Sequence, residues 1–169
     1  MQPPEVKTTG KRAKTPEQAL AALMRLCARA EKSQDDARRL MRGWGLAERE
    51  GEQVLARLVF IDDGRYAEAF VRDKLRLSGW GEYKIRTALQ RKRIDRELID
   101  AALAQADRQD MAGRLRQQLE RKMRTTRHTT QYELKTKLIR YGLSLGYDYE
   151  TVLDSAAALV TDTETCDEF

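Results

Sequence analysis

Apolar side chains recur along most of the chain at intervals of three and four residues, which places them on one face of an α-helix. Thr15 followed by Pro16 predicts a helix start, with a capping hydroxyl and a proline at the first helical position. Ser33 predicts a second start, and the glycines at 43 and 45 a stop. The stripes predicted in this part are Leu20, Leu23, Met24 and Cys27, then Val54, Leu55, Leu58 and Val59.

The stretch FIDDGRYAEAF, residues 60–70, has two possible interpretations: a metal site, or the end of one helix and the start of the next. Adjacent carboxylates at Asp62 and Asp63 suggest a metal site. As an N-cap, however, Asp62 accepts from the first free amides of a helix, and Asp63 lies where the helix dipole favours negative charge. The side chains of neighbouring aspartates at a helix start also point in different directions, which is poor geometry for sharing a metal ion. We therefore favour capping, followed by a buried stripe of Tyr66, Ala69, Phe70 and Leu77.

Three short turns have analogous sequences: in each stretch, the turn is followed by one apolar residue and then by an acidic or helix-forming start. They are RGWGL at 42–46, KRID at 92–95 and LGYD at 145–148, and Asp95 is placed to cap the helix that follows. Ile94 precedes Ile99, and Tyr147 precedes Val152, by equal steps, whereas AEREGEQ at 47–53 looks like an insertion in the first round. The pattern predicts an all-α fold of three tandem three-helix repeats, forming an elongated, curved helical stack.

The predicted boundaries follow from these turns and from composition. The head lacks an apolar period, and the end is acidic. We expect a disordered basic N-terminal arm over 1–15, repeats over 16–61, 62–107 and 108–160, and an acidic C-terminal tail over 161–169.

Composition excludes several classes of protein. Charged residues make up 35% of the 169 residues, and no apolar run approaches the roughly 18 residues of a membrane span. Cys27 and Cys166 are far apart, which argues against a disulfide framework or a zinc site. We expect a cytoplasmic protein without membrane contact.

Charge is unevenly distributed. Residues 111–147 hold nine Lys and Arg against two Asp and Glu, whereas 148–169 hold seven acidic residues and no basic ones. A basic middle suits a polyanion or an acidic protein groove, and equally a solvated helix surface.

Candidate catalytic residues are few. His128 is the only histidine and falls in the polar stretch RTTRHTTQ, while Cys27 falls on an apolar stripe. The sequence contains no GxxxxGK[ST] phosphate loop and no GxSxG elbow. We predict that the chain is not an enzyme and binds no cofactor or metal.

The middle of the chain resembles the RecX family of regulatory proteins. That family shows an I-D-D-x-R-[YF]-A-x-x-F start, a glycine turn, an I-x-x-x-L helix and a short turn. Arg93 departs from the pattern, because the family often has glycine there, and the loop of the first repeat is longer. The matching residues are Ile61, Asp62, Asp63, Arg65, Tyr66, Ala67, Phe70, Gly81, Ile85 and Leu89.

The resemblance implies an all-helical protein that binds the RecA recombinase and its filament on single-stranded DNA. It implies inhibition of the ATPase, strand-exchange and coprotease activities of RecA, within recombination, repair and the SOS response. We expect a monomer with weak, non-specific affinity for single-stranded DNA. The alternative is a stand-alone helical protein that binds DNA without sequence specificity.

The candidate partner-binding residues are two clusters of cations. Guanidinium groups bind phosphates and carboxylates alike, so the clusters do not by themselves separate DNA from protein. Trp80 and Tyr83 can stack a base or anchor a protein contact, although Trp80 is equally suited to folding back on the core. The cations are Lys84, Arg86, Arg91, Lys92, Arg93, Arg96, Arg114, Arg116, Arg121, Lys122, Arg124 and Arg127.

Overall fold

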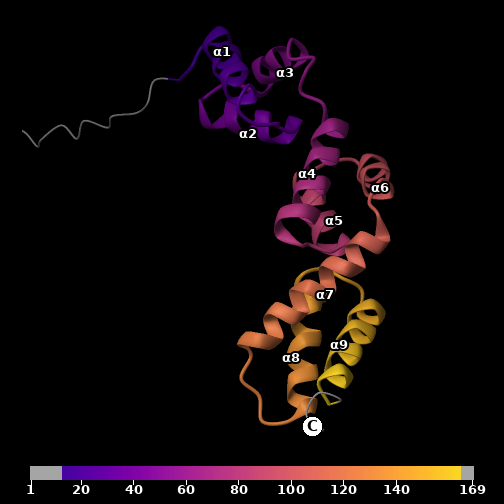
Figure 1. Ribbon diagram of the computed structural model, residues 1–169. Helices are drawn as coiled ribbons and strands as arrows, with labels where there is room; N and C mark the ends of the chain where they lie inside the picture. The colour runs from indigo at the N-terminus through magenta and orange to yellow at the C-terminus, as the bar shows by residue number, and fades with distance from the viewer. Residues whose placement is uncertain (1–12, 165–169) are drawn as a thin grey trace, which may run out of the picture. The chain divides into compact units, whose positions relative to one another are not determined.

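The computed structural model describes residues 13–164, and every helix or strand assigned within that range is an α-helix (Figure 1). The predicted all-α class is therefore confirmed. Most of the predicted basic arm and the last five residues of the predicted acidic tail lie outside the described residues. The chain divides into two compact units that meet between Asp62 and Asp63, and each is described by itself.

The first unit contains helices α1 (Pro16–Cys27), α2 (Gln34–Gly43) and α3 (Glu48–Ala56). Both predicted starts are confirmed. The amide of Gln18 donates to Thr15 Oγ1 at 3.2 Å, and that of Asp36 donates to Ser33 Oγ at 3.1 Å. The core of the unit includes Leu23, Met41, Leu46, Val54, Leu55, Leu58 and Ile61.

The second unit begins with α4 (Asp63–Ser78), α5 (Glu82–Arg91) and α6 (Arg96–Ala104). Because α4 starts at Asp63, Asp62 occupies the predicted N-cap position. Asp95 occupies the N-cap position of α6, but its side chain makes no capping hydrogen bond. These helices enclose Tyr66, Ala67, Val71, Leu75, Ile85, Leu89, Ile94, Ile99, Ala102 and Leu103.

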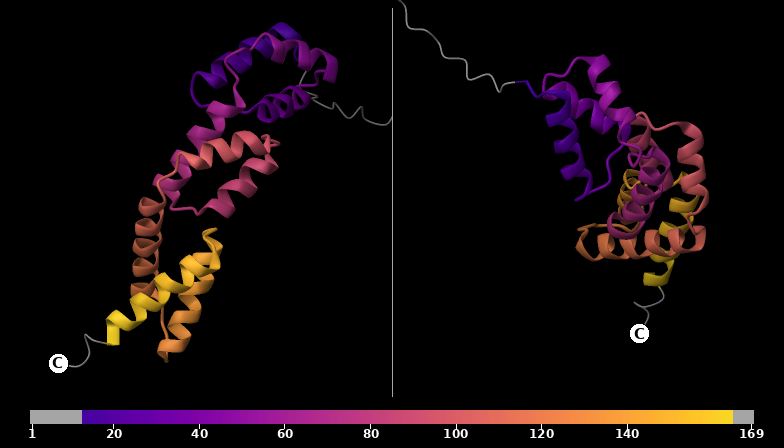
Figure 2. Two further views of the ribbon diagram at one scale, coloured as in Figure 1. Left: turned by 90° about the vertical axis from the view of Figure 1, so that its right-hand side faces the viewer. Right: turned by 90° about the horizontal axis from the view of Figure 1, so that it is seen from above.

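Three further helices of the second unit enclose a second core. They are α7 (Arg108–Thr125), α8 (Gln131–Ser144) and α9 (Tyr149–Glu164), and α8 and α9 pack side by side (Figures 1 and 2). Helix α9 continues past residue 160, where the acidic tail is expected to begin. The core includes Leu115, Leu119, Leu134, Leu138, Leu145, Tyr147, Val152, Ala156 and Leu159.

The three predicted turns share one backbone geometry. Gly45, Arg93 and Gly146 have φ angles of 83°, 56° and 91°, in the left-handed region. In each turn the next residue is buried, and its amide donates to the carbonyl five residues earlier, as from Ile94 to Leu89 O at 3.2 Å. This is the Schellman helix end, in which glycine is preferred because it has no Cβ. Arg93 therefore adopts the conformation that glycine favours.

The predicted insertion in the first repeat is wrong. AEREGEQ forms the start of α3, and Gly51 lies five residues after Leu46, as Ile99 does after Ile94. Gly51 is buried, and a Cβ built on it would lie 3.6 Å from Cε of Met41. The long Met41 side chain lies where an apolar side chain at residue 51 would otherwise pack. Because this core position holds glycine, the apolar pattern of the repeat could not be recognised in the sequence.

Three residues of the predicted stripes are exposed rather than in the core, and one of them, Met24 of α1, is 52% exposed. Val59 follows the end of α3 and is 89% exposed, and Leu77, in the last turn of α4, is 84% exposed. The inward face of α4 is completed by Val71 and Leu75 instead, which keep the spacing of four from Ala67.

Candidate partner-binding surfaces

A backbone joint links the two helical triplets of the second unit. The Gly81 amide donates to Leu145 O at 2.7 Å, and the Tyr83 amide donates to Gly146 O at 3.0 Å. The first amides of α5 thus pair with carbonyls at the end of α8, groups that helix termini otherwise leave free. Opposite ends of the two helix dipoles also meet there. The joint fixes the basic surfaces of α5 and α7 within one body.

The approach of these backbones depends on glycine. A Cβ on Gly81 would lie 2.5 Å from the carbonyl carbon and oxygen of Gly146, and one on Gly146 would lie 2.5 Å from the backbone nitrogen of Lys84. Gly81 belongs to the quoted family motif, and this contact gives it a structural role.

The predicted cations of the second repeat fall into two groups. Arg86 pairs with Asp100 at 2.5 Å and with Glu82 at 3.2 Å, and its side chain is only 26% exposed. The hydrogen bond that Arg86 donates to the Asp100 carboxylate is the main reason that the pKa of Arg86 is raised. Arg96 also lies 3.7 Å from Asp100. Arg86 is therefore held by contacts within the fold, whereas Arg91 and Arg93 are exposed.

Two lysines of this cluster lie over aromatic rings. Lys84 Nζ is 4.6 Å from the centroid of the Trp80 ring and donates to Ser144 O at 3.2 Å, while Lys92 Nζ is 5.4 Å from that of Tyr66. Lys74 Nζ also lies over Trp80, at 4.7 Å. Such contacts hold a lysine near the protein while its charge stays close to solvent.

Trp80 is folded back on the protein. It packs against the core of α4–α6, and its ring meets Phe70 edge-on with centroids 6.4 Å apart. With two ammonium groups over the ring, Trp80 is engaged inside the fold rather than offered for stacking. Tyr83, by contrast, is 63% exposed.

The predicted cations of the third repeat also divide into two groups. Arg114 donates to Leu75 O at 2.8 Å and pairs with Asp110 at 2.7 Å, and Arg116 pairs with Glu120 at 3.0 Å. Lys122 Nζ lies 5.3 Å from the centroid of the Tyr141 ring. These side chains are held by the fold.

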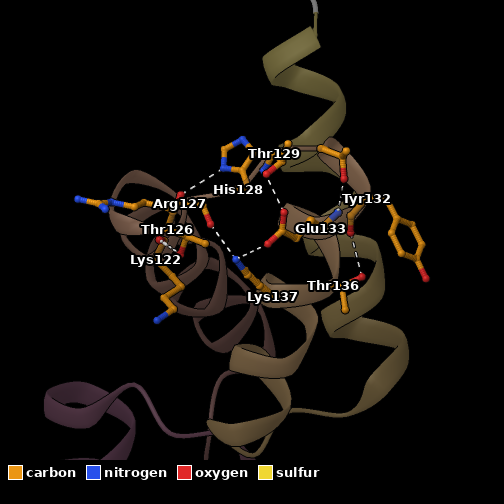
Figure 3. A network of polar contacts seen from close by, with 10 residues as sticks. Lys122, Thr126, Arg127, His128, Thr129, Tyr132, Glu133, Thr136 and Lys137 are labelled. Atoms are coloured by element: carbon orange, nitrogen blue, oxygen red, sulfur yellow. Dashed lines mark hydrogen bonds and ion pairs between the residues drawn. The ribbon is translucent and has the colours of Figure 1, made fainter.

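The other cations predicted as partner contacts in the third repeat are Arg121 and Arg124, near the end of α7, and Arg127, in the loop that follows. All three are exposed, and none has an ion-pair partner within residues 13–164. Figure 3 shows the Arg127 side chain directed away from the loop contacts. These three guanidinium groups form what we call the α7 basic end.

A polar network holds the loop that carries Arg127 (Figure 3). Lys137 Nζ donates to Arg127 O at 2.8 Å and pairs with Glu133 at 2.6 Å. The Thr129 amide donates to the other oxygen of Glu133 at 2.9 Å. Lys137 is the largest cause, and Thr129 the next, of the lowered pKa of Glu133. One carboxylate and one ammonium thus tie the loop to α8.

Of the two residues considered for catalysis, Cys27 belongs to the first unit and His128 to the second. His128 is exposed, with Nδ1 3.2 Å from Thr126 O. Cys27 is half-buried against the first core, and burial is the main reason that its thiol pKa is raised. Within residues 13–164, no cluster of three or more His, Cys, Asp and Glu side chains is placed to bind a metal, and no helix has the length and apolar character to cross a membrane.

The fold and these surfaces define an all-α protein built from three-helix units that share one turn geometry. Two family models match the chain: "RecX, second three-helix domain" over residues 62–103 and "RecX, third three-helix domain" over residues 109–154. Together the two matches span more than half of the chain. The chain belongs to the RecX family.

Curated relatives and solved structures agree with this assignment. "Regulatory protein RecX" of Clostridium beijerinckii is 36% identical over 58% of this chain and 46% of its own length, and that of Serratia proteamaculans is 33% identical over 60% of each. The chain thus matches about half the length of such relatives. The crystal structure of RecX from Lactobacillus salivarius superposes with a TM-score of 0.74 over 86% of this chain and 96% of that one, at 18% identity. That likeness concerns the fold.

Proposed function

We propose that this protein is a regulator of the RecA recombinase, which binds RecA and its filament on single-stranded DNA. Binding restrains the ATPase, strand-exchange and coprotease activities of RecA. The name that these relatives share, "Regulatory protein RecX", supports a regulatory role. We further propose that the protein acts as a monomer in the cytoplasm and catalyses no reaction itself.

The α7 basic end is the observation that carries the proposal. A guanidinium group already paired within the fold must lose that pair to bind a partner, as Arg86 would lose Asp100. Arg121, Arg124 and Arg127 are exposed without such a pair in the described residues, so they bind carboxylates or phosphates at lower cost. Among the twelve candidate cations, these three are therefore proposed as the strongest contacts, together with Arg91 on α5.

The test is the ATPase of RecA on single-stranded DNA, measured with and without this protein. The double variant R121E/R124E is expected to keep its helicity and melting temperature and to lose most of the inhibition, because partner anions would meet like charge. The matched control is R42E/R49E, which makes the same change in net charge on two exposed arginines of the first unit. Inhibition by R121E/R124E equal to that of wild type would exclude the α7 basic end as the contact.

A second candidate function is DNA binding without RecA. It is favoured by a hollow of about 430 Å³ in the second unit, lined by Tyr83, Lys84 and Arg91 among others. An exposed tyrosine beside cations suits a stacked base and its phosphate. Affinity is then expected to fall by about 0.7 log unit per log unit of salt for each phosphate contacted.

The two functions differ in one measurement. A regulator of RecA changes the ATPase at concentrations well below those that occupy the DNA, whereas a DNA binder acts only by covering the strand. The variants Y83A and R91E should weaken binding to a single-stranded oligonucleotide under the second function. Loss of ATPase inhibition that follows loss of DNA binding in every variant, with no binding to DNA-free RecA, would favour the DNA binder.

A further inference from the structure

Helix α8 carries two apolar faces, of which the core uses one. Leu134, Leu138 and Leu145 are buried against α7 and α9. The second face is formed by Tyr132, Ile139 and Leu143, spaced by seven and four residues and therefore aligned along the helix. Ile139 is partly buried and also packs against the edge of the core. Tyr132 is 82% exposed and Leu143 is 41% exposed. Figure 3 shows the Tyr132 ring on the side of α8 away from the loop network.

This second face borders a groove that continues onto α9. The groove has a volume of about 410 Å³, and α9 contributes Tyr149, which is 58% exposed, and Leu153. Two tyrosines and three aliphatic side chains therefore line one continuous hollow between the helices. Tyrosine supplies a large contact area at a low cost in conformational entropy, and aromatic anchors in pockets dominate protein interfaces.

The charge on the groove has one sign. Among the residues that the structure describes, Lys135 and Arg140 are the only charged ones that line the groove, and neither has an ion-pair partner there. Glu150 and Asp154 of α9 do not line it. A peptide segment that buries apolar side chains between α8 and α9 would therefore place its flanking residues near these two cations. This arrangement favours a partner rich in carboxylates.

We propose that the groove between α8 and α9 binds an acidic amphipathic segment of a partner protein. The spaced apolar side chains of the segment pack among Ile139, Leu143 and Leu153, and its carboxylates pair with Lys135 and Arg140. A protein is favoured over nucleic acid because three of the five apolar lining residues, Ile139, Leu143 and Leu153, are aliphatic and suit aliphatic side chains better than stacked bases. The site is separate from the α7 basic end, and it does not depend on the regulation of RecA.

The probe is a fluorescent synthetic peptide with leucines at positions i, i+4, i+7 and i+11 and glutamates on the flanks, measured by anisotropy with the whole chain. Binding is expected for this peptide and not for the same peptide with lysines in place of the glutamates. L143A/Y149A should weaken binding by about tenfold or more, as expected for central anchors. L77A is the matched control, because Leu77 is equally apolar and 84% exposed outside the groove, and it should bind as wild type.

The charge variant K135E/R140E should reverse the preference toward the lysine peptide. Thermal melts monitored by circular dichroism verify that each variant is folded. Wild-type affinity in L143A/Y149A, or equal binding of the glutamate and lysine peptides, would overturn the proposal. So would binding of an oligothymidine or of anionic phospholipid vesicles that is lost in L143A/Y149A while the peptide does not bind. Failure of the ATPase test alone would leave these results unchanged and would refute only the proposed regulation of RecA.

Discussion

Replacement of Gly81 by alanine tests whether the joint between α5 and the end of α8 holds the second unit together. The new Cβ would lie 2.5 Å from the carbonyl carbon and oxygen of Gly146, both backbone atoms that cannot rotate away. To relieve this contact the backbones must separate. Separation breaks the hydrogen bonds from the amides of Gly81 and Tyr83, at 2.7 and 3.0 Å.

The expected cost follows from these contacts. Two backbone hydrogen bonds contribute about 0.5–1.5 kcal/mol each, and forced overpacking costs about 1–3 kcal/mol. Gly81 has a φ of −85°, which alanine adopts readily, so the substitution recovers about 0.4–1 kcal/mol from the unfolded chain. We therefore expect G81A to lower the free energy of unfolding of the second unit by about 1–6 kcal/mol.

The assay follows the second unit by itself. Trp44 lies in the first unit and Trp80 in the second, so urea unfolding monitored by tryptophan fluorescence in a W44F background reports the unit that contains the joint. The matched control is G113A, because a Cβ on Gly113, inside α7, meets nothing within 4 Å. We expect G113A to be stabilised by about 0.5–1 kcal/mol, as for glycine to alanine in a helix interior. A G81A protein as stable as wild type, with its Tyr83 amide still protected from hydrogen exchange, would refute the reasoning.

Substitutions at three further positions test local features of the fold. G51A should raise the free energy of unfolding of the first unit by about 0.5–1 kcal/mol, because the new methyl group only touches Met41 at 3.6 Å; a loss measured by urea unfolding would mean that the site is full. R93G should stabilise by about 1 kcal/mol by removing the Cβ from a left-handed residue, whereas R93A, which keeps the Cβ, should not. D148A should cost about 0.5–2 kcal/mol near neutral pH. Asp148 precedes α9 and accepts hydrogen bonds from the amide and hydroxyl of Thr151, which lower the pKa of Asp148. The difference in stability between wild type and D148A should therefore vanish as the pH falls through that lowered pKa. A difference that persists in acid would contradict the role of Asp148 as an N-cap.

Helix starts and turns were predictable because each depends on a few neighbouring residues. Thr15 and Ser33 cap as expected, since a side-chain oxygen reaches an amide within one turn. The left-handed geometry at Arg93 was not predicted, because nothing in KRID itself requires it and the family resemblance showed only that Arg93 stands where glycine is common. Interactions between residues close in sequence were thus sufficient to predict these helix starts.

The errors arose where the outcome depends on distant contacts. Gly51 breaks the apolar period, and only the position of Met41 shows that the period continues in space. Leu77 has the spacing of a core residue but faces solvent because the inward face of α4 ends at Leu75. A count of cations also could not show that Arg86 is engaged by Asp100, fourteen residues later in the chain.

The joint between α5 and the end of α8 allows the proposed contact surfaces to act together on one partner. Because the Gly81 and Tyr83 amides bond directly to the end of α8, Arg91 and the α7 basic end are held in one unit and cannot move independently. Once one contact to a filament forms, the other therefore searches a restricted volume, and its effective concentration rises. Loosening the joint lowers avidity without removing any charge. G81A should therefore weaken filament inhibition more than it weakens the binding of the acidic peptide, which needs only the α8–α9 pair.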